Sequence, residues 1–181
     1  MSKKEFDDFL RKEEKKKPTI DWDDQKKWWL NKLDDLYKDI QGWLKEYIDK
    51  QQLFTECSNI DIYEEALGSY TAKQMKIQIG NKIAKIIPIG TILIGTKGRV
   101  DLTGDAGRVR FILADKQATG PRIEANVFLS EEERQNYEKQ KRARAKKVDW
   151  AWKITTSPPR IKYSELNQDS FLHCLMQVCN G

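Results

Sequence analysis

The chain has 181 residues, with a hydrophobic share of 39% and a charged share of 34%. These proportions are typical of a globular protein with a large solvated surface. We predict a polar arm over residues 1–20 and a single α+β domain over residues 21–181. The most apolar stretch, residues 83–95, is interrupted by a lysine, a proline and a glycine and is too short to cross a membrane. With no secretion signal at the N-terminus, a cytoplasmic location is the default expectation.

The net charge of +5 is unevenly distributed. Residues 134–147 carry a net charge of +6, so the rest of the chain is close to neutral. Such a cluster is typical of proteins that bind nucleic acid or an acidic partner. Its basic residues are Arg134, Lys139, Lys141, Arg142, Arg144, Lys146 and Lys147.

The cysteines do not indicate a metal site or a disulfide framework. Cys57, Cys174 and Cys179 are too few and too unevenly spaced for either. His173 is the only histidine, and on a helix it points away from its neighbour Cys174. We therefore expect neither a metal nor a Cys/His nucleophile, and no cofactor.

A long helix is predicted over residues 22–50. Apolar residues recur there at spacings of three and four, which winds one seam along a helix. Two tryptophans make the seam bulky for a dimerising coiled coil, so packing against a sheet of the same chain is the favoured interpretation. The seam consists of Trp29, Leu33, Leu36, Ile40, Trp43 and Tyr47.

Residues 60–128 change to a period of two, which predicts short antiparallel strands. Met75, Ile77 and Ile79 alternate with polar residues in one stretch. The same alternation recurs at Ile123, Ala125 and Val127. The expected fold is a bent antiparallel sheet or a partly closed small β-barrel, packed by the long N-terminal helix and a short C-terminal helix.

The glycine-rich stretch over residues 95–113 is predicted to form a hairpin within residues 98–113. If Thr103 pairs with Arg108 across a four-residue loop, the four apolar residues of the two strands share one face and Asp101 lies opposite Arg110. A shift by one residue would place arginines opposite the apolar side chains. A phosphate-binding loop is disfavoured, because a strand and not a helix follows the last glycine.

Ser130 and Glu133 form a capping box that predicts a helix over residues 131–147. This helix has no apolar stripe, so it should project into solvent from its place between two strands. A strand over residues 148–154 follows, with Trp150 and Trp152 on one face, in the core or at the surface. A C-terminal helix is predicted over residues 167–179, with His173 and Gln177 on its wet side and Phe171, Leu172, Leu175, Met176, Val178 and Cys179 on its buried side.

A metal-dependent nuclease is the remote enzymatic alternative. Asp101 is a candidate first ligand, and Asp115 followed by Lys116 is the nearest approach to an acid and lysine pair on the next strand. Asp115 and Lys116 are adjacent, so they project to opposite faces of a strand. We therefore expect a non-enzymatic protein.

Two binding functions remain. In the first, the protein is an interaction module, such as an accessory subunit or an immunity-type inhibitor, since its six tryptophans and six tyrosines exceed the needs of one core. In the second, it binds nucleic acid through residues 134–147 together with Arg99 and Arg108. The first is favoured slightly, and the sequence leaves the partner and the oligomeric state open.

Overall fold

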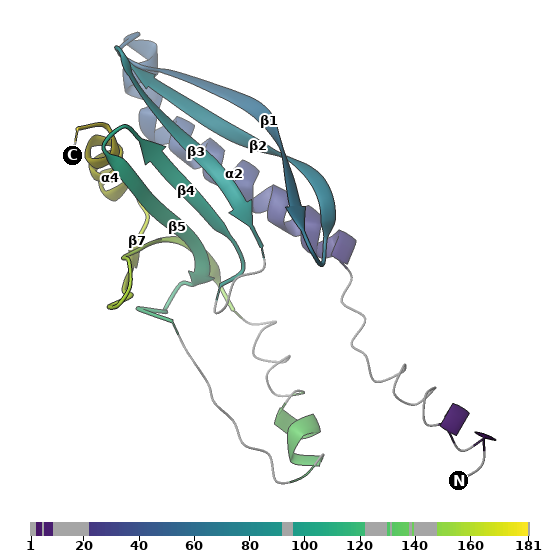
Figure 1. Ribbon diagram of the computed structural model, residues 1–181. Coiled ribbons are helices and arrows are strands. Elements are labelled where there is room, and N and C mark those ends of the chain that lie inside the picture. The colour runs from purple at the N-terminus through teal and green to yellow at the C-terminus, as the bar shows by residue number, and fades with distance from the viewer. Residues whose placement is uncertain are drawn as a thin grey trace.

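The computed structural model describes residues 3–4, 6–8, 22–91, 96–121, 130, 132–137, 139 and 148–180. A long helix, α2 (Trp22–Asp49), precedes seven antiparallel strands, and a short helix, α4 (Gln168–Asn180), follows them. In Figure 1, α2 passes behind the sheet and α4 lies beside the β4 and β5 end of it. The predicted α+β class is confirmed, and no helix among the described residues is long and apolar enough to cross a membrane.

The seven strands form one sheet in which each strand pairs with the next along the chain. The first and last strands are its edges, so the sheet is open and is not a barrel. A register shift between Pro88 and Gly90 marks an irregularity in the third strand. The strands are β1 (Phe54–Glu64), β2 (Gly68–Ile79), β3 (Lys82–Gly90), β4 (Arg99–Gly104), β5 (Gly107–Asp115), β6 (Trp150–Thr155) and β7 (Tyr163–Glu165).

The apolar seam of α2 is buried inside the molecule. Five of its residues are at most 1% exposed, namely Trp29, Leu33, Leu36, Ile40 and Leu44. Trp43 and Tyr47 were predicted in the seam and are only half-buried, whereas Leu44 takes the deeper position. Because the seam is covered by the same chain, it is not available for a coiled coil.

The predicted register of the β4 and β5 hairpin is confirmed at every pair, including Thr103 with Arg108 and Leu102 with Val109. The loop is shorter than expected, because Gly104 also pairs with Gly107. The predicted charge pair is wrong in its partner. Asp101 lies opposite Arg110 but forms its ion pairs with other arginines, described below.

Two glycines of this stretch allow helices to approach the strands. A Cβ atom added at Gly98 would lie 2.2 Å from the Trp29 ring of α2. One added at Gly104 would lie 2.3 Å from the carbonyl oxygen of Val178 in α4. The glycines therefore serve helix packing as well as turn formation.

Alternation divides the central strands into an inner and an outer face. Ile86, Leu102 and Phe111 are fully buried on the inner face, which packs against both helices. The rings of Phe111 and Phe171 of α4 are 6.2 Å apart. The core therefore lies between the sheet and the two helices, and the other side of the sheet forms the outer face.

A carboxylate ties the β1 and β2 hairpin to the end of β3. Glu64 accepts a hydrogen bond from the Tyr70 hydroxyl at 2.6 Å. Its other oxygen accepts bonds from the backbone N–H and the hydroxyl of Thr91, at 2.9 and 3.0 Å. Nearby, Tyr37 of α2 donates its hydroxyl to the Lys73 carbonyl at 2.5 Å. These bonds hold β2 to β1 and to α2, and they hold the end of β3 to β1.

Helix α4 begins one residue later than predicted, after a reciprocal cap. Asn167 accepts a bond from the Ser170 N–H at 3.0 Å, and Ser170 accepts one from the Asn167 N–H at 2.9 Å. His173 and Gln177 are exposed, as expected. Met176 was predicted to be buried and is 59% exposed, because it lies on the side of the helix away from the sheet.

Three boundaries differ from the sequence analysis. The sheet begins at Phe54 and not at residue 60, and a short seventh strand, Tyr163–Glu165, was not predicted. The sixth strand runs over Trp150–Thr155. The alternating stretch at residues 122–129, predicted as a strand, lies outside the described residues.

Part of the predicted basic helix is described. Residues 132–137 and 139 are helical, and the Glu133 N–H donates to the Ser130 hydroxyl at 3.2 Å, as the capping box requires. Most of their side chains are exposed, in keeping with a helix that has no apolar stripe. Lys141, Arg142, Arg144, Lys146 and Lys147 lie outside the described residues.

Substitution of Gly104 by Ala should destabilise the protein by about 2–3 kcal/mol, because the new methyl group meets backbone and not a movable side chain. Gly42→Ala is the matched control, since nothing lies within 4 Å of a Cβ atom there and the residue is inside α2. It should stabilise the protein by about 0.5–1 kcal/mol. Urea unfolding measures both, and an equal effect of the two substitutions would contradict the packing.

Stability should fall above about pH 10. Burial raises the pKa of Tyr37 in the folded chain, and burial with the Glu64 hydrogen bond raises that of Tyr70. Tyrosines in the unfolded chain ionise near pH 10, so these two stabilise the fold below that pH and lose this contribution as the pH rises. At about pH 11 the loss should be about 1 kcal/mol for each residue.

Urea unfolding at about pH 8 and pH 11 tests this expectation. Tyr37→Phe should be less stable than the wild type at the lower pH but should show a smaller drop between the two. A drop of the same size in both proteins would mean that Tyr37 does not cause it.

Candidate functional site: an aromatic hollow between α2 and β6

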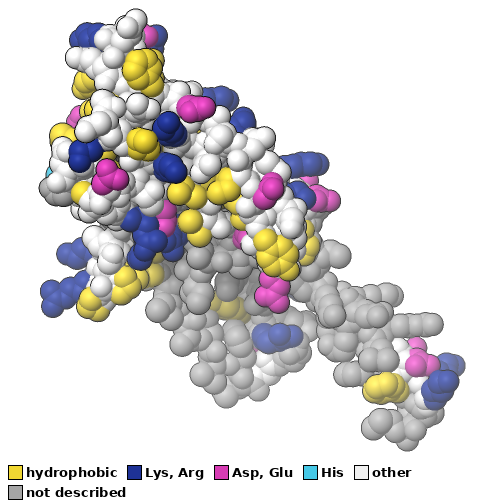
Figure 2. Space-filling model, turned by 45° about the horizontal axis from the view of Figure 1, so that its top comes forward, with side chains coloured by type: hydrophobic (Ala, Val, Ile, Leu, Met, Phe, Trp, Pro, Cys, Tyr) yellow, Lys and Arg dark blue, Asp and Glu magenta, His cyan; other side chains and the backbone are white. Residues whose placement is uncertain are grey.

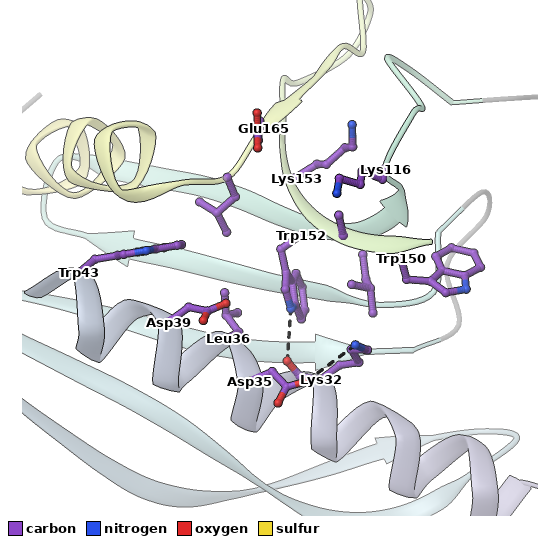
Figure 3. Close-up of a pocket in the computed structure, with 13 residues that line it drawn as sticks. Lys32, Asp35, Leu36, Asp39, Trp43, Lys116, Trp150, Trp152, Lys153 and Glu165 are labelled. Atoms are coloured by element: carbon purple, nitrogen blue, oxygen red, sulfur yellow. Dashed lines mark hydrogen bonds and ion pairs between the residues drawn. The ribbon is translucent and has the colours of Figure 1, made fainter. Parts of the chain in front are cut away.

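A hollow of about 400 Å³ opens between α2 and β6, and we call it the aromatic hollow. Helix α2 approaches β1, β2 and α4 more closely than it approaches β6, so large side chains bridge the wider end (Figure 3). Three tryptophans, three leucines, an alanine and six charged residues line the space. They are Lys32, Asp35, Leu36, Asp39, Trp43, Leu113, Lys116, Trp150, Ala151, Trp152, Lys153, Glu165 and Leu166.

Trp152 forms the middle of the wall. It projects from the inner face of β6 opposite Leu113, and its ring centroid is 5.9 Å from that of Trp29 in the core. Its indole N–H donates to the Lys32 carbonyl of α2 at 3.2 Å. The indole is therefore fixed at one end and presents the rest of its surface to the hollow, as Figure 3 shows.

Trp150 stands two residues away on the same face of β6. Its ring meets Trp28 of α2 edge to face, with centroids 6.2 Å apart. The ammonium group of Lys97 lies 5.9 Å from the Trp150 centroid, within range of a cation–π interaction. Whether Trp150 and Trp152 belong to core or surface is thus resolved: both are half-buried and belong to the boundary between the two.

Trp43 closes the other end of the hollow. It projects from α2, and its ring centroid is 5.6 Å from that of Phe171 in α4. The amide of Gln168 donates to the Trp43 carbonyl at 3.2 Å, so α4 holds this part of α2. The three tryptophans are thus each supported from behind by another element, and the walls of the hollow are preorganised.

The charges around the hollow are not all paired within the chain. Lys32 lies 3.7 Å from Asp35, and the Lys153 ammonium donates to the Ala118 carbonyl at 2.9 Å. Asp39 and Glu165 form no ion pair or side-chain hydrogen bond with any described residue. In Figure 3 Asp39 lies between Trp43 and Trp152, whereas Glu165 lies toward Lys153, its partner in the β6 and β7 register. Because Lys153 stands opposite Glu165, the carboxylate without a nearby cation in the register is Asp39, at the Trp43 end.

The hairpin arginines predicted as binding residues converge on one carboxylate of the outer face. Arg99 donates two bonds to Asp101, from Nε at 2.7 Å and from Nη2 at 2.6 Å. Arg108 approaches the same carboxylate at 3.4 Å. Asp101 is 2% exposed, so the two cations offset the cost of its burial.

The register also separates the two acids considered for a nuclease site. Asp101 pairs with Arg110 and projects to the outer face, whereas Asp115 pairs with Trp150 and projects to the inner face. These two carboxylates cannot share one metal ion. Among the described residues, no group of three or more His, Cys, Asp or Glu side chains is placed to hold a metal.

Sequence reasoning identified the tryptophans but not the hollow. The alternation of Trp150 and Trp152 predicts that they share a face. Nothing local shows that Asp39 of α2 and Glu165 of β7 border the same space, because that depends on where the helix crosses the sheet. Of the predicted cationic residues, Arg134 and Lys139 are exposed, and those from residue 141 to 147 lie outside the described part of the chain.

Comparison of the chain with protein families, with curated proteins and with solved structures finds no match to any of them. The geometry of the described residues is therefore the basis of the functional proposals that follow.

Proposed function

We propose that the protein is a protein-interaction module that binds a partner segment in the aromatic hollow. The observation that carries the proposal is the set of three half-buried tryptophans around one space, each held from behind by core residues. Rigid aromatic side chains in a pocket contribute most to binding energy at protein interfaces, because they lose little conformational entropy on binding.

The arrangement of polar groups supports a protein segment as ligand. Charged residues of both signs surround the apolar walls, three lysines and three acids in all. An apolar centre with a polar rim is the usual anatomy of a protein interface. A phosphate backbone would be repelled by Asp39, which forms no ion pair with a described residue. Nucleic acid is therefore the poorer ligand for this site.

The same charges define the expected segment. An apolar or aromatic side chain would fill the space beside Trp152, against Leu36 and Leu113. A neighbouring lysine or arginine would face Asp39 and could stack on Trp43. We therefore expect the partner to present an apolar anchor followed closely by a basic residue.

Selection of displayed random peptides on the intact protein tests the proposal. Selected peptides should carry the apolar anchor and the basic residue, and their binding should change little with salt because the anchor is apolar. Asp39→Lys combined with Glu165→Lys should weaken their binding at least tenfold by reversing the charge of two of the three carboxylates that line the hollow. Isothermal titration of the purified protein with each synthetic peptide measures the change.

The matched control is Glu56→Lys combined with Glu65→Lys, which reverses two exposed carboxylates outside the lining of the hollow, one on β1 and one in the turn that follows it. This control should bind the peptides like the wild type. Equal weakening by both double variants would show that net charge alone matters. If the selected peptides bind the Asp39→Lys and Glu165→Lys double variant as tightly as the wild type, the interaction takes place at another surface.

A further inference from the structure

We propose a second binding surface, independent of the aromatic hollow, on the outer face of the sheet, and we assign it to the phosphate backbone of a nucleic acid. Cationic side chains form a row across four strands there. Lys76 of β2 pairs with Lys85 of β3, Lys85 pairs with Thr103 of β4, and Thr103 pairs with Arg108 of β5. We call Lys76, Lys85 and Arg108 the basic row.

The basic row faces outward by the register of the sheet. Ile77, Ala84 and Leu102 are fully buried on the inner face, so the residues next to them along each strand project to the other side. Figure 2 shows Lys and Arg side chains next to exposed hydrophobic ones on the face that it presents. The cations are thus available to a ligand that approaches the open side of the sheet.

Fold stability does not account for the basic row. Like charges directly opposite each other on neighbouring strands are destabilising, and Lys76 and Lys85 form such a pair; Glu56 of β1 lies opposite Lys76 on its other side, but no acid lies opposite Lys85, whose other partner is Thr103. Neither lysine forms an ion pair with a described residue. An external anion would remove the repulsion, which is the expected signature of a charged binding surface.

Further arginines extend the positive surface along β4 and β5. Arg110 lies two residues from Arg108 on the same face and has no ion pair with a described residue. The side chain of Arg108 is 51% exposed although it also approaches Asp101. Asp101 therefore orients Arg108 while half of that side chain stays exposed, whereas the side chain of Arg99 is 22% exposed. A guanidinium group held in this way is well suited to phosphate.

The spacing of the row suits a polyanion. Neighbouring strands are about 5 Å apart, so Lys76 and Lys85 are one such step apart and Lys85 and Arg108 are two steps apart. A duplex carries one phosphate for about every 1.7 Å of its axis, so several phosphates can meet the row together.

The segment that contains most of these cations is basic as a whole: over residues 82–116 there are seven basic residues and three acidic ones. Over residues 22–65, six stand against eleven. The positive charge is therefore concentrated on one part of the molecule.

Two other anionic partners fit less well. Lysine is depleted at protein interfaces, whereas Lys and Arg supply most phosphate contacts. Peripheral membrane binding usually inserts several aromatic side chains, but of the two most exposed ones on β1 only Phe54, at 59%, borders the row, since it pairs with Gln78, whereas Tyr63, at 73%, pairs with Ser69 at the other end of the strand. The other exposed large apolar side chains on β3 are Ile83 and Ile89, at about 40% each.

The first test is binding of labelled single-stranded DNA, single-stranded RNA and duplex DNA of about 20 nucleotides, from about 50 to about 300 mM NaCl. If about three phosphates are neutralised, the logarithm of the association constant should fall against the logarithm of salt with a slope of about −2 for single strands and about −3 for duplex. Lys76→Gln, Lys85→Gln and Arg108→Gln combined should weaken binding at least tenfold and bring the slope close to zero.

The matched control removes three exposed lysines from α2, with Lys27→Gln, Lys38→Gln and Lys45→Gln combined. This control variant loses three positive charges, like the basic-row variant. Its association constant and its salt slope should both stay within twofold of the wild-type values. Equal losses in the two triple variants would overturn the proposal. So would the absence of nucleic-acid binding at the lowest salt concentration.

Three further outcomes would also overturn it. One is binding that survives the basic-row variant but is lost when Arg142, Arg144, Lys146 and Lys147 become Glu, which would place it on the predicted basic helix. The others are tighter binding of poly-glutamate or of phosphatidylserine vesicles than of nucleic acid.

A single substitution separates binding from folding. Lys85→Gln removes the repulsion with Lys76, so the midpoint of urea unfolding should stay the same or rise while nucleic-acid binding falls. A structural role for Lys85 would lower both. A lower midpoint accompanied by weaker binding would therefore count against the proposal.

Discussion

Burial of the α2 seam against the twisted sheet is the constraint on which the rest of the structure depends. Trp29 is completely buried and meets elements that are far apart in the sequence. It packs closely enough on Gly98 that no side chain fits there, and its ring lies 5.9 Å from that of Trp152. One helical side chain thus sets the position of β4 and β6. Because interiors are close-packed, a change of a single atom at these contacts has to displace a strand or the helix.

The aromatic hollow follows from this packing. A straight helix cannot follow a twisted sheet along its whole length, so α2 lies close to β1 and β2 and farther from β6. Trp43, Trp150 and Trp152 bridge the wider end without filling it. Their apolar surface stays partly hydrated in the free protein, and its removal from water is a source of binding free energy that costs no folding stability.

The sequence predicts pairings that alternation fixes and misses those that tertiary structure sets. In the β4 and β5 hairpin only one register keeps Val100 and Leu102 on the apolar face, so it could be derived directly. The partner of Asp101 could not, because Arg99 on the same strand reaches the carboxylate as easily as Arg110 across from it. The first half of β1 was missed because it is an edge strand with exposed residues on both faces, which leaves no alternation to detect.

The two proposed surfaces use opposite faces of one sheet, and this arrangement has a consequence for binding. The aromatic hollow lies on the inner side, whereas Lys76, Lys85 and Arg108 project outward. The two ligands would therefore not compete for space, and the strands between them are fixed by buried residues on the inner face. Strand β5 lies in both sites, with Arg108 in the basic row and Leu113 in the hollow, but its buried residues hold it in place, so coupling between the sites should be mainly electrostatic. Salt screens such coupling over about 10 Å, so the two sites should act almost independently at physiological ionic strength.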